Sequence, residues 1–208
     1  MCQFFSLLIL RGGGIRHHWN IDSHSDLVAY YGLRDTDAFL RHFAKAELTP
    51  PSNQADYFDF AQWQWRLDEP TRPAWLDEDA EANAAAEARA VLADRTRTTG
   101  TIPLIADGLW LLGGTVAVSK MTGGRVIGVG GSAQIRDVWG SAQIQSVGGS
   151  AQIHGVGGSA RIWDVSGSAQ IQGVGDSAQI RDVSGSAQIR NVRSAATLDA
   201  SAKAHVVA

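Results

Sequence analysis

Seven consecutive nonapeptides fill residues 131–193 without a gap, and they constrain the fold more than any other feature of the chain. A typical unit reads GSAQIQSVG, with apolar residues at its third, fifth and eighth positions. The third and fifth side chains of an extended strand share one face, and the Gly-Ser pair favours a turn. A single strand of this kind cannot bury its Ile and Val, whereas stacked copies can. The repeats therefore predict a β-solenoid, in the manner of a parallel β-helix or roll.

The size of one coil follows from how many residues are needed to enclose a core. Nine residues are too few, so we predict two repeats, or 18 residues, per coil, with three repeats as the alternative. Worn copies of the repeat extend upstream, and about nine units would then form four or five coils. The worn copies are carried by Val116, Val118, Met121, Val126 and Val129. Ile, Val and Ala should point inward, while outward ladders should form from Gln134, Gln152, Gln170 and Gln188 and from Arg136, His154, Gln172 and Arg190.

Calcium-binding β-rolls share the nine-residue period, but their pattern is GGxGxDxUx. Here the fourth position is Gln or Arg, and Asp stands at the seventh position only in Asp137, Asp164 and Asp182. Most turns lack the carboxylates that an oxygen cage for calcium requires. We therefore expect no metal and no cofactor.

The residues before the repeats predict an α+β module over 1–100, followed by a solenoid over 101–208 with irregular caps. An apolar strand over 3–10 and residues 15–21 should form a hairpin, and Ser23 or Ser25 should cap a short helix that ends near Gly32. Residues 35–46 fit a helix or a strand. The aromatic stretch 57–67 predicts a hairpin or two short strands, and 74–95 predicts a helix. Residues 102–112 should form an irregular cap, while Ala196 and Leu198 continue the repeat.

Composition limits the setting and the partners. The net charge of −3 provides no basic field for nucleic acid, and the single cysteine, Cys2, excludes an intramolecular disulfide framework. The apolar run near the N-terminus is too short to span a bilayer and lacks the features of a signal peptide. We therefore expect a cytoplasmic protein with no membrane or nucleic-acid partner.

Three segments in a fixed order carry a resemblance to a known family. They are MCQFFS at the start, DSHSDLVAYYGL after it, and the C-terminal SAQI repeats, with Asp68-Glu69-Pro70 to Trp75 lying between. This combination resembles an uncharacterised family of actinobacterial and actinophage proteins, over nearly the whole chain. The resemblance implies a phage or prophage setting and assigns no activity.

One candidate catalytic set joins Cys2, His24 and Asp22. Cys2 would be the nucleophile, with either its own α-amino group or His24 as the base and Asp22 orienting the ring. Class II glutamine amidotransferases also begin with such a cysteine, but they continue with Gly-Ile where this chain has Gln3-Phe4. The alternatives are that Cys2 starts a buried strand and the DSHS run caps a helix, or that Asp22, His24 and His17 or His18 bind a metal. The spacing of that last set matches no strong zinc template.

Two further hypotheses concern binding by the N-terminal module. The start of the short helix, with Ser23, Ser25 and His24, could hold an anion, although two aspartates oppose it. The aromatic residues of the stretch 57–67 could stack bases or sugars, or they could form the core of the module. The aromatic residues concerned are Tyr57, Phe58, Trp63 and Trp65.

The solenoid itself offers a candidate recognition surface. Trp139 and Trp163 are large side chains at positions where the other repeats have small or polar ones, and such residues often anchor partners. The full set of candidates is Arg136, Trp139, His154, Trp163, Arg181 and Arg190. We predict a non-enzymatic binding or structural protein with a protein partner, in which an end or face of the solenoid allows self-association. The alternative is a small cytosolic thiol-dependent hydrolase or transferase with Cys2 as nucleophile.

Overall fold

The computed structural model describes residues 5–34, 42–193 and 195–207, and the chain divides into two compact units. The N-terminal unit comprises Met1–Ser52 and Asp59–Asp94, and the solenoid unit comprises Asn53–Phe58 and Arg95–Ala208. The boundary between the two units lies between residues 94 and 95, whereas the sequence suggested a boundary at residue 100. In addition, a six-residue segment from between two strands of the N-terminal unit is part of the solenoid unit.

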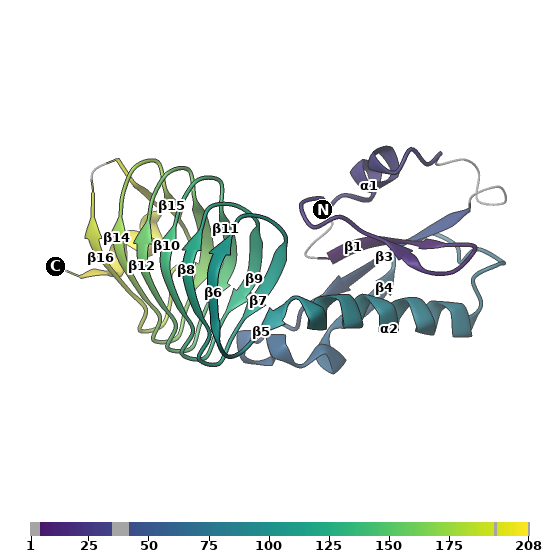
Figure 1. Cartoon of the computed structure of the whole chain (residues 1–208), viewed down its shortest axis with the longest axis horizontal. Coiled ribbons are helices and arrows are strands. Elements are labelled where there is room, and N and C mark those ends of the chain that lie inside the picture. Colours follow the sequence, from purple (N-terminus) through teal and green to yellow (C-terminus); the bar gives the residue numbers. More distant parts are fainter. Residues whose placement is uncertain (1–4, 35–41, 194, 208) are drawn as a thin grey trace. The chain divides into compact units, whose positions relative to one another are not determined.

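A four-stranded antiparallel sheet organises the N-terminal unit (Figure 1). Its strands are β1 (Phe5–Leu10), β2 (Ile15–Arg16), β3 (Phe43–Thr49) and β4 (Gln64–Leu67), in the order β2-β1-β3-β4. The predicted hairpin of β1 and β2 is present, although β2 has two residues and does not continue to residue 21. Most of the ambiguous segment 35–46 lies outside the described residues, and its end forms the start of β3.

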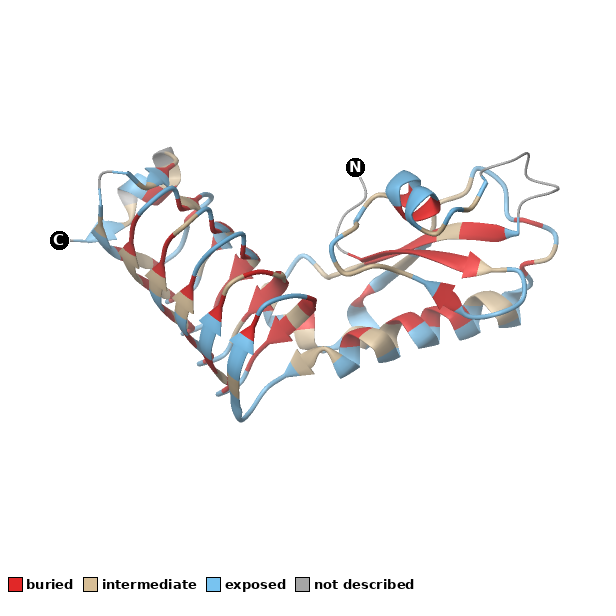
Figure 2. Ribbon diagram, turned by 45° about the horizontal axis from the view of Figure 1, so that its top comes forward, coloured by how far each residue is buried: buried red, intermediate tan, exposed pale blue. Residues whose placement is uncertain are grey.

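Helices α1 (His24–Tyr30) and α2 (Glu78–Asp94) lie on opposite faces of this sheet (Figure 1). Ser23 caps α1 by accepting a hydrogen bond from the backbone of Asp26, and Gly32, at φ +63°, follows its end, as predicted. Helix α2 begins four residues later than predicted, directly after Asp77, whose carboxylate accepts the N–H of Ala80 at 2.7 Å. The buried face of α2 consists of Ala84, Ala85, Ala88 and Leu92 (Figure 2).

The prediction of a hairpin or two short strands over residues 57–67 is wrong. Two short 3₁₀ helices, η1 (Gln54–Phe58) and η2 (Phe60–Gln62), precede the single strand β4. Between them, Asp59 accepts the N–H of Ala61 at 3.1 Å and caps η2, which ends the extended conformation that the alternating pattern suggested. Trp63 is fully buried, whereas the Trp65 indole is half-buried and donates to Glu81 at 2.9 Å.

The solenoid unit consists of two parallel sheets of seven strands each (Figure 1). The odd sheet contains β5 (Thr96–Arg97), β7 (Leu109–Leu112), β9 (Arg125–Val129), β11 (Gln143–Val147), β13 (Arg161–Val165), β15 (Gln179–Ile180) and β17 (Thr197–Leu198). The even sheet contains β6 (Thr101–Ile105), β8 (Ala117–Met121), β10 (Gln134–Val138), β12 (Gln152–Val156), β14 (Gln170–Val174), β16 (Gln188–Val192) and β18 (Val206–Val207). Gln134 pairs with Gln152 and Gln152 with Gln170, so the coils of the clean repeats have 18 residues each, as predicted.

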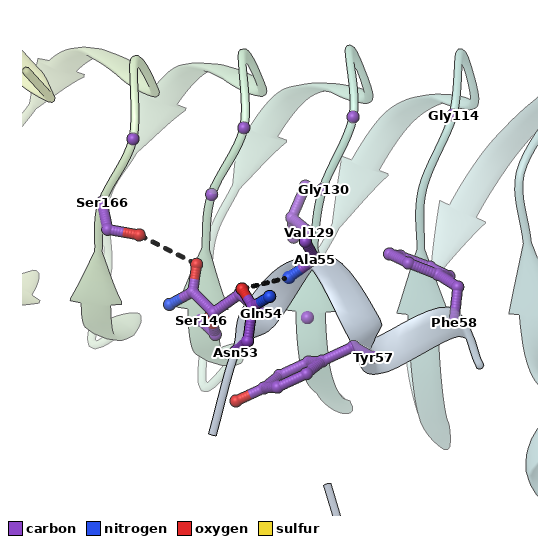
Figure 3. A pocket seen from close by; sticks show the side chains of 15 residues that line it. Asn53, Gln54, Ala55, Tyr57, Phe58, Gly114, Val129, Gly130, Ser146 and Ser166 are labelled. Carbon is purple, nitrogen blue, oxygen red and sulfur yellow. Dashed lines mark hydrogen bonds between the residues drawn. The ribbon is translucent and has the colours of Figure 1, made fainter. Parts of the chain in front are cut away.

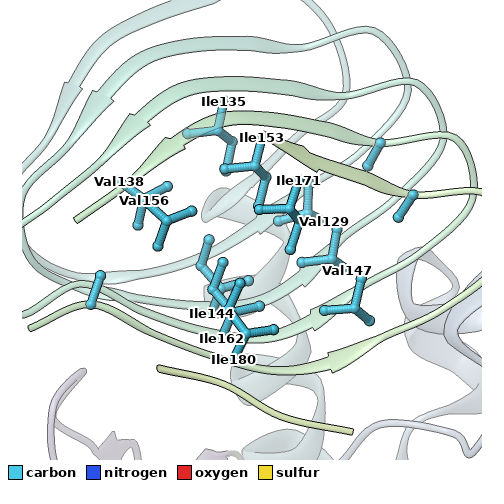
Figure 4. Close-up of a cluster of buried hydrophobic side chains, with 14 of the residues drawn as sticks. Val129, Ile135, Val138, Ile144, Val147, Ile153, Val156, Ile162, Ile171 and Ile180 are labelled. Atoms are coloured by element: carbon cyan, nitrogen blue, oxygen red, sulfur yellow. The ribbon is translucent and has the colours of Figure 1, made fainter. Parts of the chain in front are cut away.

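Stacked Ile and Val side chains fill the space between the two sheets (Figure 4). Ile135, Ile153 and Ile171 form one row from the even sheet and are completely buried, and a facing row comes from the odd sheet. Burying one such side chain contributes about 1.5–3 kcal/mol. The worn repeats join the same core, because Val118 pairs with Ile135 and Val126 with Ile144.

The N-terminal end of the solenoid is more regular than the sequence suggested, and the C-terminal end continues the repeat as expected. Residues 102–112 form the regular strands β6 and β7 instead of an irregular cap, and the described strands make more coils than the four or five predicted. At the other end Leu198 pairs with Ile180, as expected, and α3 (Ala200–Ala204) follows it. Asp199 caps α3, and its hydrogen bonds to the backbone of Ala202 and Asp182 lower the pKa of this carboxyl. No helix among the described residues is long and apolar enough to cross a membrane.

Candidate functional site

Residues 53–58, here called the strap, lie along one turn of the solenoid coils (Figure 3). The ring of Phe58 covers Gly113 and Gly130, and a methyl group on Gly113 would lie 2.6 Å from that ring. The ring of Tyr57 covers Gly128 in the same way, at 2.7 Å. Only glycine leaves room for the rings at these positions, so the glycines of the coils form the docking surface for the strap.

Polar contacts complete the attachment of the strap. Gln54 lies against Gly148 and accepts a hydrogen bond from the Ser166 hydroxyl at 2.9 Å (Figure 3). Tyr57 is 8% exposed and its hydroxyl bonds to the Ser146 side chain. Burial and the nearby Asp164 carboxylate raise the pKa of Tyr57, so its hydroxyl stays neutral and serves as a hydrogen-bonding anchor.

The strap groove is a cavity of about 560 Å³ between the strap and the turns of the coils (Figure 3). Every residue that lines it is uncharged. Its polar groups come from Asn53, Gln54, Tyr57, Ser146 and Ser166. The chain itself fills part of this groove with the strap, which supplies the aromatic rings that the coils lack at this turn.

A second groove, the Trp139 groove, lies at the other turn of the coils and has a volume of about 240 Å³. Trp139 follows β10 and is 44% exposed, and the edge of its ring covers Gly157. Arg193 follows β16, and its aliphatic stem covers Gly175. The groove is lined by Asp137, Trp139, His154, Gly155, Val156, Gly173, Gly175, Asp176 and Arg193.

Most polar side chains of the Trp139 groove have no close polar partner among the described residues. The side chains of Trp139, His154 and Arg193 form no hydrogen bond or ion pair with the part of the chain that the structure describes. Asp137 lies 3.9 Å from the guanidinium of its exposed neighbour Arg136, a separation that contributes little. Asp176 accepts the N–H of Gly158 at 3.0 Å, which holds its carboxylate at the rim.

The structure brings together two of the six residues predicted for the recognition surface, Trp139 and His154. Arg136, His154 and Arg190 belong to one row on the even sheet, as the predicted ladder requires. Trp163 and Arg181 belong instead to the odd sheet or its continuation. A surface made of all six at once is therefore not present.

Sequence reasoning missed Asp176, Arg193 and the strap. The first two had a detectable signal, because Asp176 replaces the glycine that begins the other six clean repeats. Arg193 and Trp139 are the two large residues at the ninth position, where the other repeats have Gly or Ser. With 18 residues per coil, both lie at the same turn.

The predicted thiol site is described only in part, because Cys2 lies outside the described residues. His24 is buried, with Nδ1 3.0 Å from a carboxylate oxygen of Asp68 and Nε2 2.9 Å from the carbonyl oxygen of Ala46. Asp68, rather than the predicted Asp22, is thus the carboxylate at Nδ1, while the backbone carbonyl of Asp22 accepts a bond from Ser6 at 2.7 Å. Both ring nitrogens of His24 face oxygen acceptors, so the ring braces α1 against β3 and the end of β4.

The same network includes an ion pair between the exposed Arg66 and the buried Glu47. Arg66 donates to the buried Glu47 carboxylate through Nε at 2.7 Å, and it lies 3.6 Å from Asp68. These side-chain contacts therefore connect Glu47 with Arg66, Arg66 with Asp68, and Asp68 with His24. Sequence spacing gave no sign of this network because the groups come from distant segments.

The other sequence hypotheses for the N-terminal residues receive less support. Within the described ranges, no group of three or more His, Cys, Asp and Glu side chains is placed to hold a metal. His17 packs against Trp19, and the imidazole of His18 accepts the N–H of Asn20 at 3.3 Å. The Ser23 hydroxyl caps α1. Tyr57 and Trp63 are buried, which removes them from any stacking platform.

A comparison of this chain with protein families, with curated proteins and with solved structures finds no match. The fold described above rests on strand pairing and burial, and the candidate site rests on the geometry of the two grooves.

Proposed function

We propose that this protein is a non-enzymatic binding protein whose solenoid serves as scaffold and recognition surface. The observation that carries the proposal is the Trp139 groove, where an exposed indole, an imidazole and a guanidinium surround a glycine floor and have no hydrogen-bond or ion-pair partner among the described residues. Exposed Trp and Arg side chains are typical anchors of recognition sites. The strap supports the proposal, because it shows that glycines at a turn of these coils accept rings from another segment.

The scaffold suits this role because its strands are paired in register above a fully buried core. Side chains at the turns therefore start from nearly fixed backbone positions, and binding costs little conformational entropy of the backbone. The sequence expectations of a protein partner, a cytoplasmic setting and a phage or prophage origin belong to this proposal.

Fluorine NMR of the full chain tests whether the groove recognises anything. Protein labelled with 5-fluorotryptophan has seven possible signals, and the variant Trp139→Phe assigns the one from Trp139. We expect fractions of a bacterial lysate to shift the Trp139 signal and to leave the signal of the buried Trp63 in place. If no fraction shifts the Trp139 signal, recognition through this groove is wrong.

One observation favours the alternative function, a thiol-dependent hydrolase or transferase. The His24 Nδ1 atom lies 3.0 Å from a carboxylate oxygen of Asp68, the kind of contact that orients a catalytic imidazole. If Cys2 is a nucleophile activated by His24, iodoacetamide should alkylate it rapidly near neutral pH, and His24→Asn should slow the reaction at least tenfold. An alkylation rate that is the same in both proteins, measured by mass spectrometry under native conditions, would contradict the thiol mechanism.

A further inference from the structure

We infer that the ligand of the Trp139 groove is a neutral saccharide, one of whose pyranose rings lies against the indole of Trp139. The inference rests on the proposed function and names the class of ligand for the same groove. For this groove alone, it departs from the protein partner that the sequence suggested, for reasons that lie in the lining of the groove.

The aromatic wall is the first reason. The Trp139 ring is supported from below, since a methyl group on Gly157 would lie only 3.0 Å from its edge. With 44% of the residue exposed, part of the ring remains open to a ligand. A pyranose ring has one apolar face of C–H groups, which suits the flat and amphipathic surface of an indole.

The charges around the groove are the second reason. Asp137 and Asp176 would repel an anionic ligand, and Arg193 would repel a cationic one. A hydroxyl group both donates and accepts hydrogen bonds, so a polyol can satisfy carboxylates, guanidinium and imidazole together. The imidazole of His154 adds one nitrogen that donates a hydrogen bond or one that accepts it. The mixed lining therefore selects a neutral ligand that is rich in hydroxyl groups.

Size is the third reason. The groove, at about 240 Å³, is smaller than the ~300–1,000 Å³ of ordinary small-molecule pockets. A specific protein interface buries about 800 Å² of each partner, so a groove of this volume would form only a small part of one. One sugar unit at the end of an oligosaccharide, or one that projects from it, matches these dimensions better than a helix or a protein surface does.

The strap groove provides an internal contrast. Its lining is uncharged, and its ligand, the strap, brings the rings of Tyr57 and Phe58 to bare glycines. The Trp139 groove instead has an aromatic ring of its own and adds charged groups. Its ligand must therefore bring hydroxyl groups and an apolar ring face rather than aromatic side chains.

The test uses the full chain labelled with 5-fluorotryptophan and a panel of defined probes. Neutral probes are maltotetraose, cellotetraose, mannotetraose and galactotetraose, and charged probes are trigalacturonic acid and chitotetraose with free amino groups. An acidic and a basic decapeptide represent protein ligands. We expect at least one neutral tetrasaccharide to shift the Trp139 signal in a saturable way, with an affinity at least tenfold above that of every charged probe and both peptides.

Three variants connect the response to the groove. Trp139→Ala should weaken the binding of the responding saccharide at least tenfold, as measured by calorimetry. Arg193→Met keeps the aliphatic stem that covers Gly175 and should weaken binding several-fold. Arg181→Met, which changes an exposed arginine of the other sheet region, is the matched control and should bind like the parent. Circular dichroism and melting temperature should stay unchanged in all three.

The outcomes separate the ligand class from the proposed function. If lysate fractions shift the Trp139 signal and no neutral saccharide does, the groove recognises another ligand and the saccharide inference is wrong. If a charged probe or a peptide binds more tightly than every neutral saccharide, the inference is also wrong while recognition stands. If nothing shifts the signal, the proposed function itself fails.

Discussion

The strap groove and the Trp139 groove occur at the two turns of the coils and are built from the same repeat, yet a segment of the chain lines the first while the second has none among the described residues that line it. At the first turn the ninth position of the clean repeats is Gly or Ser, and the strap lies over Gly113, Gly130 and Gly148. At the second turn Trp139 and Arg193 occupy two of the four ninth positions and Gly157 and Gly175 the others, and no strap is present among the described residues that line the groove. The comparison shows that the regular positions of the repeat form the floor of both grooves. The residues that depart from the repeat decide what each groove accepts.

The largest expected effect concerns the buried core of the solenoid, which supports both grooves. Ile153 of β12 is fully buried, so Ile153→Asp places an unpaired charge in the core and should cost more than about 4 kcal/mol of unfolding free energy or abolish folding. Its neighbour Gln152 points outward, and Gln152→Ala should change stability by less than about 0.5 kcal/mol. Urea unfolding followed by circular dichroism measures both. If Ile153→Asp is tolerated and Gln152→Ala is destabilising, the assignment of inward and outward side chains is reversed.

The next effect compares the two grooves directly. Tyr57→Ala should reduce the free energy of unfolding by about 2–3 kcal/mol, because it removes a mostly buried ring and its bond to Ser146. Trp139→Ala should cost less than about 0.5 kcal/mol, because the indole is exposed and forms no internal hydrogen bond in the described chain. The comparison breaks if Trp139→Ala is the more destabilising change in the same urea titration.

A matched pair of glycine substitutions sharpens the comparison. A methyl group on Gly113 would meet the docked ring of Phe58 at 2.6 Å, so Gly113→Ala should displace the strap and cost about 1–2 kcal/mol. A methyl group on Gly175 would meet the flexible stem of Arg193 at 3.2 Å, and Gly175→Ala should cost little, since the side chain can move. Hydrogen exchange of residues 53–58 should accelerate only in the first variant. Equal protection of the strap in both would show that Gly113 does not hold it.

The smallest effect concerns the carboxylates beside the strap. Burial and the neighbouring Asp182 raise the pKa of Asp164 above its unfolded value, so its ionised form is disfavoured in the folded state. The contribution of Asp164 to stability therefore falls as pH rises through the unfolded and then the folded pKa, and it stays low above them. Asp164→Asn should stabilise the protein by about 0.5 kcal/mol or less at pH 7 and have no such effect near pH 3.

The double variant with Asp182→Asn supplies the control for this effect. If the repulsion between Asp164 and Asp182 contributes, the gain from Asp164→Asn at pH 7 should shrink once Asp182 is neutral. Melting temperatures at both pH values measure the difference. A gain of the same size at pH 3 would show that it does not come from ionisation.

The repeats show which features of the fold can be predicted from local periodicity. The 18-residue coil, the inward Ile and Val, the worn repeats at Val118 and Val126 and the continuation at Leu198 were all predicted, and the structure confirms them. Those predictions depend on side-chain alternation and on a period, both of which are properties of neighbouring residues. The prediction for the aromatic stretch 57–67 failed because alternating apolar and polar residues occur both in strands and in short 3₁₀ helices. Here Asp59 caps the second of two such helices.

The candidate sites depend on positions that are distant in the sequence. Cys2, His24 and Asp22 were grouped because they are near one another in the chain, yet the carboxylate at His24 Nδ1 is that of Asp68. Of six predicted surface residues, Trp139 and His154 share a groove, and their neighbours Asp176 and Arg193 come from later coils. An alignment of the repeats at 18-residue spacing would have placed Trp139 and Arg193 at one turn.

By itself, then, the sequence determined the solenoid, because nine residues with a strand, a turn and three apolar positions cannot bury their side chains except by stacking. Tertiary structure alone decided that residues 53–58 lie on the coils and that Asp137, Trp139, His154, Asp176 and Arg193 surround one groove. The physical reason is that burial inside a repeat is a local matter repeated many times. A groove, in contrast, forms only where side chains from separate coils, or a strap from another segment, meet at the same turn.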